Sequence, residues 1–208
     1  MVSQRNRIIN LISYLESLGI EINVGKNKAY GNKGYFKAVN EKFRIDIAKG
    51  LSDENVLRVL IHEFAHFIHY SYDKSLKSLD FLIKDISDDI WEEFISLTVD
   101  SIPKESIQPL YDAKLKLENE IDVLKNNKLN LYAMFELKQK QRFLKSINNK
   151  ISRLNRYYNT PSELFARSME LYITNPETFK IKAPLLNEKY KSLIKNNIIP
   201  MMSNLVKY

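Results

Sequence analysis

The chain has 208 residues, of which 44% are hydrophobic and 11% aromatic, with no cysteine and a formal net charge of +7. This composition supports a folded core and excludes an intrinsically disordered chain. The absence of cysteine excludes disulfides, thiolate metal ligands and a cysteine nucleophile, so any metal must be held by histidine and carboxylate side chains. The length predicts one domain, or one domain with a sizeable insertion.

The beginning of the chain predicts no export signal. Its apolar stretch at residues 8–15 is interrupted by polar residues and is followed by no small-residue cleavage site. No apolar run approaches the length of a membrane span. We therefore expect a cytoplasmic protein without a membrane span, unless a route that this chain does not encode delivers it elsewhere.

The first fifty residues predict one helix and a small sheet. Apolar residues between positions 4 and 18 recur at helical spacing, and Gly19 supplies a stop for this helix. Short strands are expected at 20–24, 34–39 and 43–48, where apolar and polar residues largely alternate. The last of these strands is expected to form an edge of the sheet.

The middle of the chain predicts helices separated by prolines. Ser52 is a suitable N-cap for a helix that runs to about residue 70 or 73. A second helix is expected at about 75–99, and Pro103 and Pro109 mark a break after it. Residues 104–156 predict a helical hairpin, whose second arm carries a coiled-coil seam of apolar residues spaced by three and four positions. The seam consists of Leu144, Ile147, Ile151, Leu154 and Tyr158.

The last part of the chain predicts two more helices. Thr160 can cap a helix that begins at Pro161, and Glu163 completes a capping-box pattern. Pro176 ends this helix, and a final helix is limited by Pro200. The fold class is therefore predicted to be α+β, mostly helical, with a small N-terminal sheet and an inserted helical hairpin.

The most informative stretch is an apolar run at residues 59–70 that contains the pattern His62-Glu63-x-x-His66. Residues four apart share a face of a helix, so the two histidines can direct their imidazoles to one point, and two neutral nitrogens suit Zn²⁺. Glu63 lies about 100° around the helix from His62, where it can take a proton from a water held by the metal. The alternative is a core helix with two satisfied histidines, but burying these polar side chains is costly unless each is paired.

A catalytic zinc usually has three protein ligands, and four side chains are candidates for the third. His69 and Asp73 lie farther along the same helix, but a straight helix cannot easily wrap three successive turns around one ion. We expect His69 instead to bond a carbonyl or a carboxylate near the helix end. Glu163 and Glu170 lie one and three turns into the later helix, and either could reach the site if the two helices pack together. Spacing alone does not choose between them.

Two segments of the chain resemble a known family of enzymes. They are His62-Glu63-Phe64-Ala65-His66 and Pro161-Ser162-Glu163-Leu164-Phe165-Ala166. They resemble zinc peptidases of the zincin fold, in particular the family of the anthrax lethal factor catalytic domain and related proteases of phages and mobile elements. In that family the third ligand is the glutamate that opens a Glu-aromatic-Phe-Ala motif. The resemblance implies Glu163 as this ligand, Leu164 in place of the first aromatic residue, and a zincin-like catalytic domain over 1–208.

The same family has a tyrosine a few residues before that glutamate, whose hydroxyl supports the tetrahedral intermediate. Tyr157 and Tyr158 lie six and five residues before Glu163, whereas the family's own spacing falls on Arg156. Because Tyr158 also fits the coiled-coil seam, the resemblance implies Tyr157 as the assisting residue.

These features predict a zinc endopeptidase that acts on a protein or peptide substrate. Its metal ligands would be His62, His66 and Glu163, and its catalytic residues Glu63 and Tyr157. A peptidase that cleaves a transcriptional repressor and a toxin that acts inside a host cell would use the same chemistry.

The charge of the expected hairpin supports a different alternative. Residues 136–156 carry seven Lys/Arg against the single acid Glu136. A solvated helix face is the simplest interpretation. The alternative is a catalytically silent scaffold that contacts nucleic acid or an acidic protein partner through this face. The oligomeric state is open, because the seam can close on itself or on another chain.

Overall fold

The computed structural model describes residues 4–26, 33–80, 87–101, 104–126 and 131–196. The chain divides into two compact units, the first made of Met1–Val99 and Pro161–Tyr208 and the second of Asp100–Thr160. The described part is mostly helical with a three-stranded sheet, which confirms the α+β class. Within the same ranges, no helix combines the length and the apolar character needed to cross a membrane.

The elements of the first unit agree with most of the sequence predictions. The helix at 4–18, the three strands, the helix after Ser52 and the helix that begins at Pro161 are all confirmed. Their bounds are α1 Gln4–Ser17, β1 Ile20–Lys26, β2 Gly34–Val39, β3 Lys42–Ala48, α2 Asp53–Tyr72 and α6 Pro161–Thr174. The remaining helices are α3 Asp88–Ser101, which begins in this unit, α7 Pro176–Lys182 and α8 Pro184–Lys195.

The sheet has the order β1-β3-β2, with β1 parallel and β2 antiparallel to β3. Strands β2 and β3 are joined by a two-residue turn, in which Asn40 and Glu41 both have positive φ. The prediction that 43–48 forms a sheet edge is wrong, because β3 is the central strand. Its alternation reflects two fully buried residues, Ile45 and Ile47, rather than a free edge.

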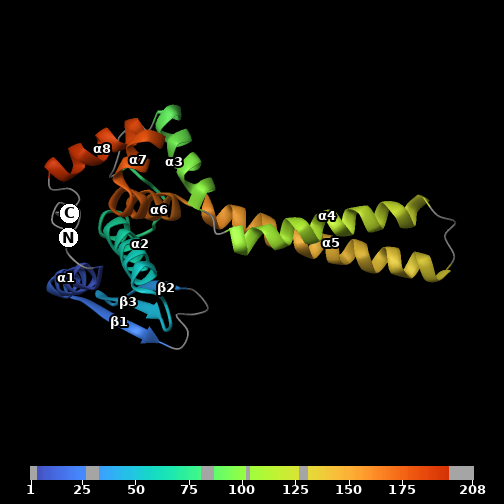
Figure 1. The fold of residues 1–208 in the computed structure, drawn as a ribbon, viewed down its shortest axis with the longest axis horizontal. Helices are drawn as coiled ribbons and strands as arrows, with labels where there is room; N and C mark the ends of the chain where they lie inside the picture. Colours follow the sequence, from blue (N-terminus) through green and yellow to red (C-terminus); the bar gives the residue numbers. More distant parts are fainter. Residues whose placement is uncertain (1–3, 27–32, 81–86, 102–103, 127–130, 197–208) are drawn as a thin grey trace. The chain divides into compact units, whose positions relative to one another are not determined.

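Helix α2 is the centre of the first unit. It packs against α1, β2 and β3 on one side and against α6 on the other, and Figure 1 shows it between the sheet and α6. The Ser52 hydroxyl accepts a hydrogen bond from the Asn55 N–H and caps the start of the helix. The side chains that α2 contributes to the core are almost fully buried. They are Val56, Leu57, Leu60, Ile61, Phe64, Ala65 and Ile68.

The predicted helix at 75–99 is wrong in its first half, because α3 begins at Asp88 and residues 74–80 are not helical. The Asp73 carboxylate explains this loop. It accepts hydrogen bonds from the N–H groups of Ser75, Lys77 and Ser78, at 2.8–2.9 Å. An aspartate that binds the following backbone in this way ends a helix and holds a turn. The apolar periodicity persists because Leu79 is buried although it is not in a helix.

The C-terminal part has one helix more than predicted. Pro176 ends α6 as expected but also starts α7, where the Asn175 side chain accepts a hydrogen bond from the Thr178 N–H. At the start of α8, the Glu93 carboxylate accepts hydrogen bonds from the N–H groups of Leu185 and Leu186. Pro200, the predicted limit of the final helix, lies outside the described residues.

The second unit is a helical hairpin made of α4 Lys104–Asn126 and α5 Leu131–Tyr158. The expected insertion at 104–156 falls within this unit. Pro109 does not break the chain as predicted but lies inside α4. As the sixth residue of the helix it lies beyond the first turn, so its missing N–H removes one intrahelical hydrogen bond. Of the predicted seam, Ile151 and Tyr158 are buried.

Candidate metal site

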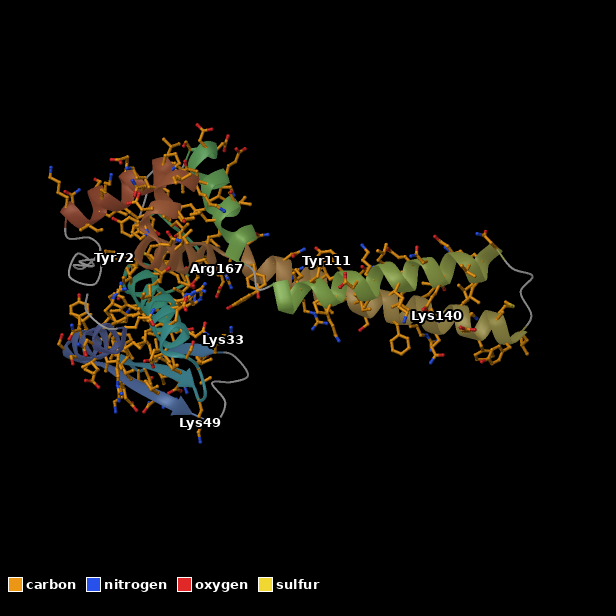
Figure 2. All side chains as sticks on the ribbon, viewed as in Figure 1. Lys33, Lys49, Tyr72, Tyr111, Lys140 and Arg167 are labelled. Carbon is orange, nitrogen blue, oxygen red and sulfur yellow. The ribbon has the colours of Figure 1, made fainter. Side chains whose placement is uncertain are left out.

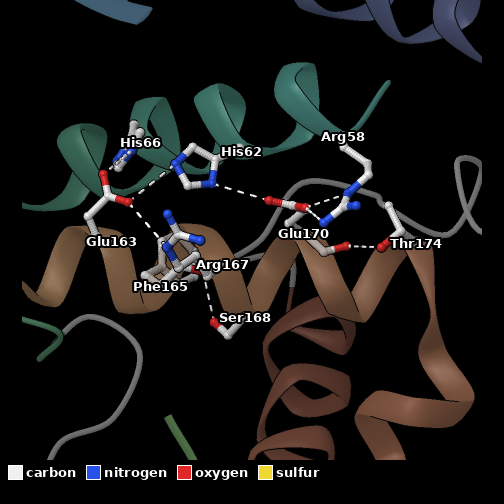
Figure 3. A network of polar contacts seen from close by, with 9 residues as sticks. All are labelled: Arg58, His62, His66, Glu163, Phe165, Arg167, Ser168, Glu170 and Thr174. Carbon is white, nitrogen blue, oxygen red and sulfur yellow. Dashed lines mark hydrogen bonds and ion pairs between the residues drawn. The ribbon is translucent and has the colours of Figure 1, made fainter. Parts of the chain in front are cut away.

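Three side chains from α2 and α6 meet at one point. His62 Nε2 lies 3.5 Å from Glu163 Oε2, and His66 Nε2 lies 3.3 Å from Glu163 Oε1. One ligand atom from each of the three residues falls within 4.8 Å of the others. The structure therefore brings together the two histidines of the sequence motif and Glu163, as Figure 3 shows.

The spacing of these atoms fits a tetrahedral metal ion. Zinc–nitrogen and zinc–oxygen bonds of about 2.0–2.1 Å place tetrahedral ligand atoms about 3.4 Å apart. The two nitrogen–oxygen distances of 3.5 and 3.3 Å are close to this value, although each runs to a different oxygen of the Glu163 carboxylate. They are longer than an ordinary charge-assisted hydrogen bond of about 2.7–2.9 Å. Two imidazoles and one carboxylate are the protein ligands of a common type of catalytic zinc site. They leave the fourth coordination position open.

Helices α2 and α6 run antiparallel along this site, because successive turns of α2 meet α6 in reverse order. Arg58 contacts Glu170, His62 contacts both Glu170 and Glu163, and His66 contacts Glu163. The three α2 residues are four positions apart and therefore share one face. A single face of each helix thus carries the whole polar seam (Figure 3).

The second nitrogen of each imidazole has its own partner on α6. His66 Nδ1 lies 2.7 Å from Ser162 Oγ, and His62 Nδ1 lies 3.4 Å from Glu170 Oε2. With Nδ1 donating to these oxygens, both histidines keep Nε2 free to accept a metal. Arg58 Nε in turn donates to Glu170 Oε1 at 2.7 Å. Ser162, Glu170 and Arg58 therefore fix the orientation of the two rings.

The charged side chains along the contact between α2 and α6 stabilise one another's ionised forms. Burial alone would lower the pKa of His62, but hydrogen bonds and charge from Glu163 and Glu170 outweigh it and raise this pKa to about 10. A metal ion bound at this point would therefore have to displace the proton on His62 Nε2. Burial would raise the pKa of Glu163, yet the hydrogen bonds from His62 and His66 hold it well below its usual range. The carboxylate is therefore ionised, as a metal ligand must be.

Glu63 lies on a neighbouring face of α2, against β2. Burial raises its pKa, an effect that the charges of His66 and His62 partly offset. The backbone N–H of Phe36 donates to its carboxylate. A Cβ on Gly34 would clash with Val59 and would stand 2.8 Å from Glu63 Oε1. The strand can approach the helix this closely only because position 34 has no side chain.

The other two ligand candidates on α2 point elsewhere. His69 is fully buried, and its Nε2 donates to the Ser78 carbonyl at 2.7 Å. Burial lowers the pKa of His69, so it is a neutral core histidine, and the expectation that it bonds a carbonyl near the helix end is confirmed. Asp73 holds the loop that presents the Ser78 carbonyl. Glu170, the remaining alternative, faces Nδ1 of His62 rather than the common point of the Nε2 atoms.

Tyr157 and Tyr158 belong to the second unit, at the end of α5. Tyr158 is buried, as expected of a residue in the coiled-coil seam of α5. Tyr157 is half-exposed and packs edge-to-face on Tyr158. The assisting role of Tyr157 stays a prediction.

Sequence reasoning did not assign roles to Ser162, Arg58 or Arg167. Ser162 directly precedes Glu163, and Arg58 lies four residues before His62, so its position on the histidine face could have been found from helical spacing. Arg167 Nε lies 3.5 Å from Glu163 Oε2, one turn further along α6. It places a cation beside the ligand carboxylate.

Comparison of the chain with protein-family models, with curated proteins and with solved structures finds no match.

Proposed function

We propose that this protein is a zinc-dependent endopeptidase of zincin type. The observation that carries the proposal is the convergence of His62 Nε2, His66 Nε2 and the Glu163 carboxylate at distances that suit a tetrahedral ion, beside a buried Glu63. This is the donor set that the resemblance to the lethal factor family implies. The alternative of a silent scaffold has no use for a buried glutamate held against β2.

Each residue of the site has a separate proposed role in peptide hydrolysis. When bound, zinc supplies Lewis acidity and lowers the pKa of a water molecule toward neutrality. His62, His66 and Glu163 hold it, while Ser162 and Glu170 keep both imidazoles in the required tautomer. Glu63 takes the proton of the attacking water and passes it to the leaving amine, a task that its raised pKa favours. Tyr157 is the proposed hydroxyl donor to the developing oxyanion.

Strand β2 is the proposed docking edge for an extended substrate. Among the described strands, β2 pairs only with β3, so its other edge has no partner in the sheet. The Phe36 N–H donates to Glu63 and therefore points to this open edge. A peptide added to β2 as a further strand would lie beside the general base, with main-chain hydrogen bonds supplying affinity.

The test compares the zinc-loaded protein with Glu63→Gln, using cleavage of a diverse peptide library followed by mass spectrometry. We expect the substitution to lower the cleavage rate by about 10²–10⁴-fold, the usual contribution of a general base, without changing the zinc content. Glu54→Gln, at an exposed position on the same helix, is the matched control. Cleavage by Glu63→Gln at the wild-type rate would refute the role of Glu63. Failure of the zinc-loaded wild type to cleave any peptide would refute the peptidase assignment.

A further inference from the structure

The hairpin carries almost all of the net charge of the protein on one helix. Helix α5 contains seven Lys/Arg and one acid, Glu136, which gives it a charge of +6 out of the +7 of the whole chain. Helix α4 has both signs along its length. The catalytic proposal makes no use of this charge.

Five of the seven cations form one stripe. At 100° per residue they fall within an arc of about 80° on the side of α5 opposite the residues that pack on α4. They span 19 residues, or about 27 Å of helix. All five are exposed, and Asn149, also exposed, occupies the gap in the middle of the series. The stripe consists of Lys138, Arg142, Lys145, Arg153 and Arg156.

The cations of this stripe have no acidic partner within the part of the chain that the structure describes. Lys140, on the opposite side of the same helix, shows the contrast. Its ammonium lies 2.7 Å from Glu120 of α4 and 3.3 Å from Glu136, and Figure 2 shows it on α5 within the hairpin. The folded hairpin thus neutralises its inward cation and leaves the outward row uncompensated.

Large aromatic side chains flank the stripe near the tip of the hairpin. Tyr132, Phe135 and Phe143 are 78%, 71% and 57% exposed, which is unusual for residues of this size. Tyr132 and Phe135 line a pocket of about 410 Å³ together with Glu136, Lys138, Gln139 and Arg142; the Glu136 carboxylate in this lining is paired with Lys140. Exposed rings next to arginine and lysine are the elements that bind single-stranded nucleic acid, where bases stack on rings and phosphates follow the cations.

Two other partners fit this face less well. A helix that lies on a membrane needs an apolar row along its length, but the exposed side chains between Phe143 and Tyr157 are all polar or charged. A second copy of the chain would have to offer a matching row of acids. The exposed acids at the start of α3 are Asp88, Asp89 and Glu92, which cover only about 6 Å of helix.

We propose that the outer face of α5 binds single-stranded nucleic acid along its phosphate backbone. A linear polyanion matches a linear row of unpaired cations, and the row is several nucleotides long. The aromatic group at the tip receives bases by stacking, so the interaction tolerates different sequences. None of the residues of this interface lies on α2 or α6, the helices that carry the candidate metal site.

The first experiment measures the affinity of the full-length protein for a fluorescent 20-nucleotide single strand at several salt concentrations. If all five cations contact phosphates, the slope of log K against log salt is about −3.5, from about −0.7 per contact. The triple variant Lys138→Gln, Arg142→Gln, Arg153→Gln should bind more weakly and reduce this slope to about −1.4. The matched control removes three charges at exposed positions of the first unit, Lys49→Gln, Lys74→Gln and Lys180→Gln, and should change neither value.

Helical content measured by circular dichroism shows whether the stripe variants are folded, which we expect because none of the substituted side chains packs on α4. A control triple variant that loses affinity as strongly as the stripe variant would overturn the proposal, because net charge alone would then explain binding. The same holds if polyglutamate or vesicles of anionic phospholipid bind the stripe and the oligonucleotide does not. Absence of oligonucleotide binding at low salt would also overturn it.

A second variant tests the stacking part of the proposal. Phe135→Ala should lower affinity by several-fold to about tenfold without changing the salt slope, because it removes no charge. Leu131→Ala, which truncates another exposed apolar side chain at the same tip, is its control. Equal losses in both variants would assign the effect to apolar area and refute base stacking.

Discussion

The seam between α2 and α6 and the outer face of α5 both collect charged side chains at helical spacing, but they treat those charges differently. Between α2 and α6, Arg58, Glu170, His62 and Glu163 contact one another in series, and all of them except the half-exposed Arg58 are largely buried. On the outer face of α5, the five cations of the stripe are exposed and have no acidic partner among the described residues. Buried charges must be paired to be tolerated, so the seam has one low-energy arrangement.

The two regions differ in how closely the fold fixes the positions of their side chains. The contact between α2 and α6 brings two imidazole nitrogens and a carboxylate oxygen within 4.8 Å of one another, because the two helices hold these side chains between them. The α5 helix fixes only the line along which its cations lie and leaves each exposed side chain free to move. A flexible polymer can adapt to such a surface. We therefore expect substitutions in the seam to have large and specific effects, and those on the hairpin to have small ones.

Substitution of Glu163, the proposed third ligand, should give the largest effect. We expect Glu163→Gln to weaken zinc affinity by at least about 10³-fold, because a neutral amide is a poor ligand and two histidines remain alone. Competition with a chromophoric chelator measures this affinity. Glu118→Gln, at an exposed position on the hairpin, should leave it unchanged. Wild-type affinity in Glu163→Gln would move the third ligand to another side chain.

Truncation of a buried leucine of α2 should give the next largest effect. Leu60 is fully buried on α2, whereas Leu115 on α4 is 61% exposed. We expect Leu60→Ala to lower the free energy of unfolding by about 2–5 kcal/mol through the cavity that it leaves, and Leu115→Ala to change it by less than about 0.5 kcal/mol. Urea denaturation followed by circular dichroism measures both. Similar losses at the two positions would mean that the hairpin is packed as tightly as the first unit.

A methyl group at Gly34 tests how closely β2 is held to the general base. The added Cβ would displace Glu63 or Val59, and a shift of about 1 Å at a reacting group can cost about 100-fold in rate. We expect Gly34→Ala to lower the cleavage rate by up to this factor while zinc affinity is retained. Unchanged cleavage would show that the strand can move away without harm. Parallel loss of zinc would show that the change reaches the metal ligands as well.

Loss of a ring-orienting acid should weaken zinc binding less than loss of Glu163. Glu170→Gln keeps an oxygen toward His62 but loses the charge that Arg58 and the imidazole share, and such changes cost about 10–100-fold in metal affinity. Glu120→Gln removes the partner of Lys140 on the hairpin and should leave zinc affinity unchanged. A fall of more than about 10³-fold for Glu170→Gln would identify Glu170 as a direct ligand.

Most of the site could be predicted from the sequence because its main part is local. His62 and His66 share one helix, so helical spacing alone placed their rings together. Helical spacing could not place Glu163 beside the histidines, because the residues of α6 that meet them lie far along the chain. Ser162, which contacts His66, is 96 residues further on. Only the resemblance singled it out from Glu170. No spacing rule could show which of the two carboxylates faces Nε2 and which faces Nδ1.

The errors of the sequence predictions share a physical cause. Periodicity shows which residues are buried, and it does not show what buries them. Leu79 is buried from a loop that Asp73 organises, and Ile45 and Ile47 are buried in a central strand rather than an edge. Pro176 both ends one helix and begins the next, because its fixed φ suits a first helical turn.

The placement of Glu163 also has a consequence for biosynthesis. A ribosome makes the two histidines first, then the whole hairpin, and only afterwards the segment that carries the third ligand. A nascent chain that ends at Thr160 has the complete His62-Glu63-x-x-His66 pattern but lacks a carboxylate to close the metal site. If the protein is the peptidase proposed above, its activity would therefore arise late in translation, when α6 docks on α2.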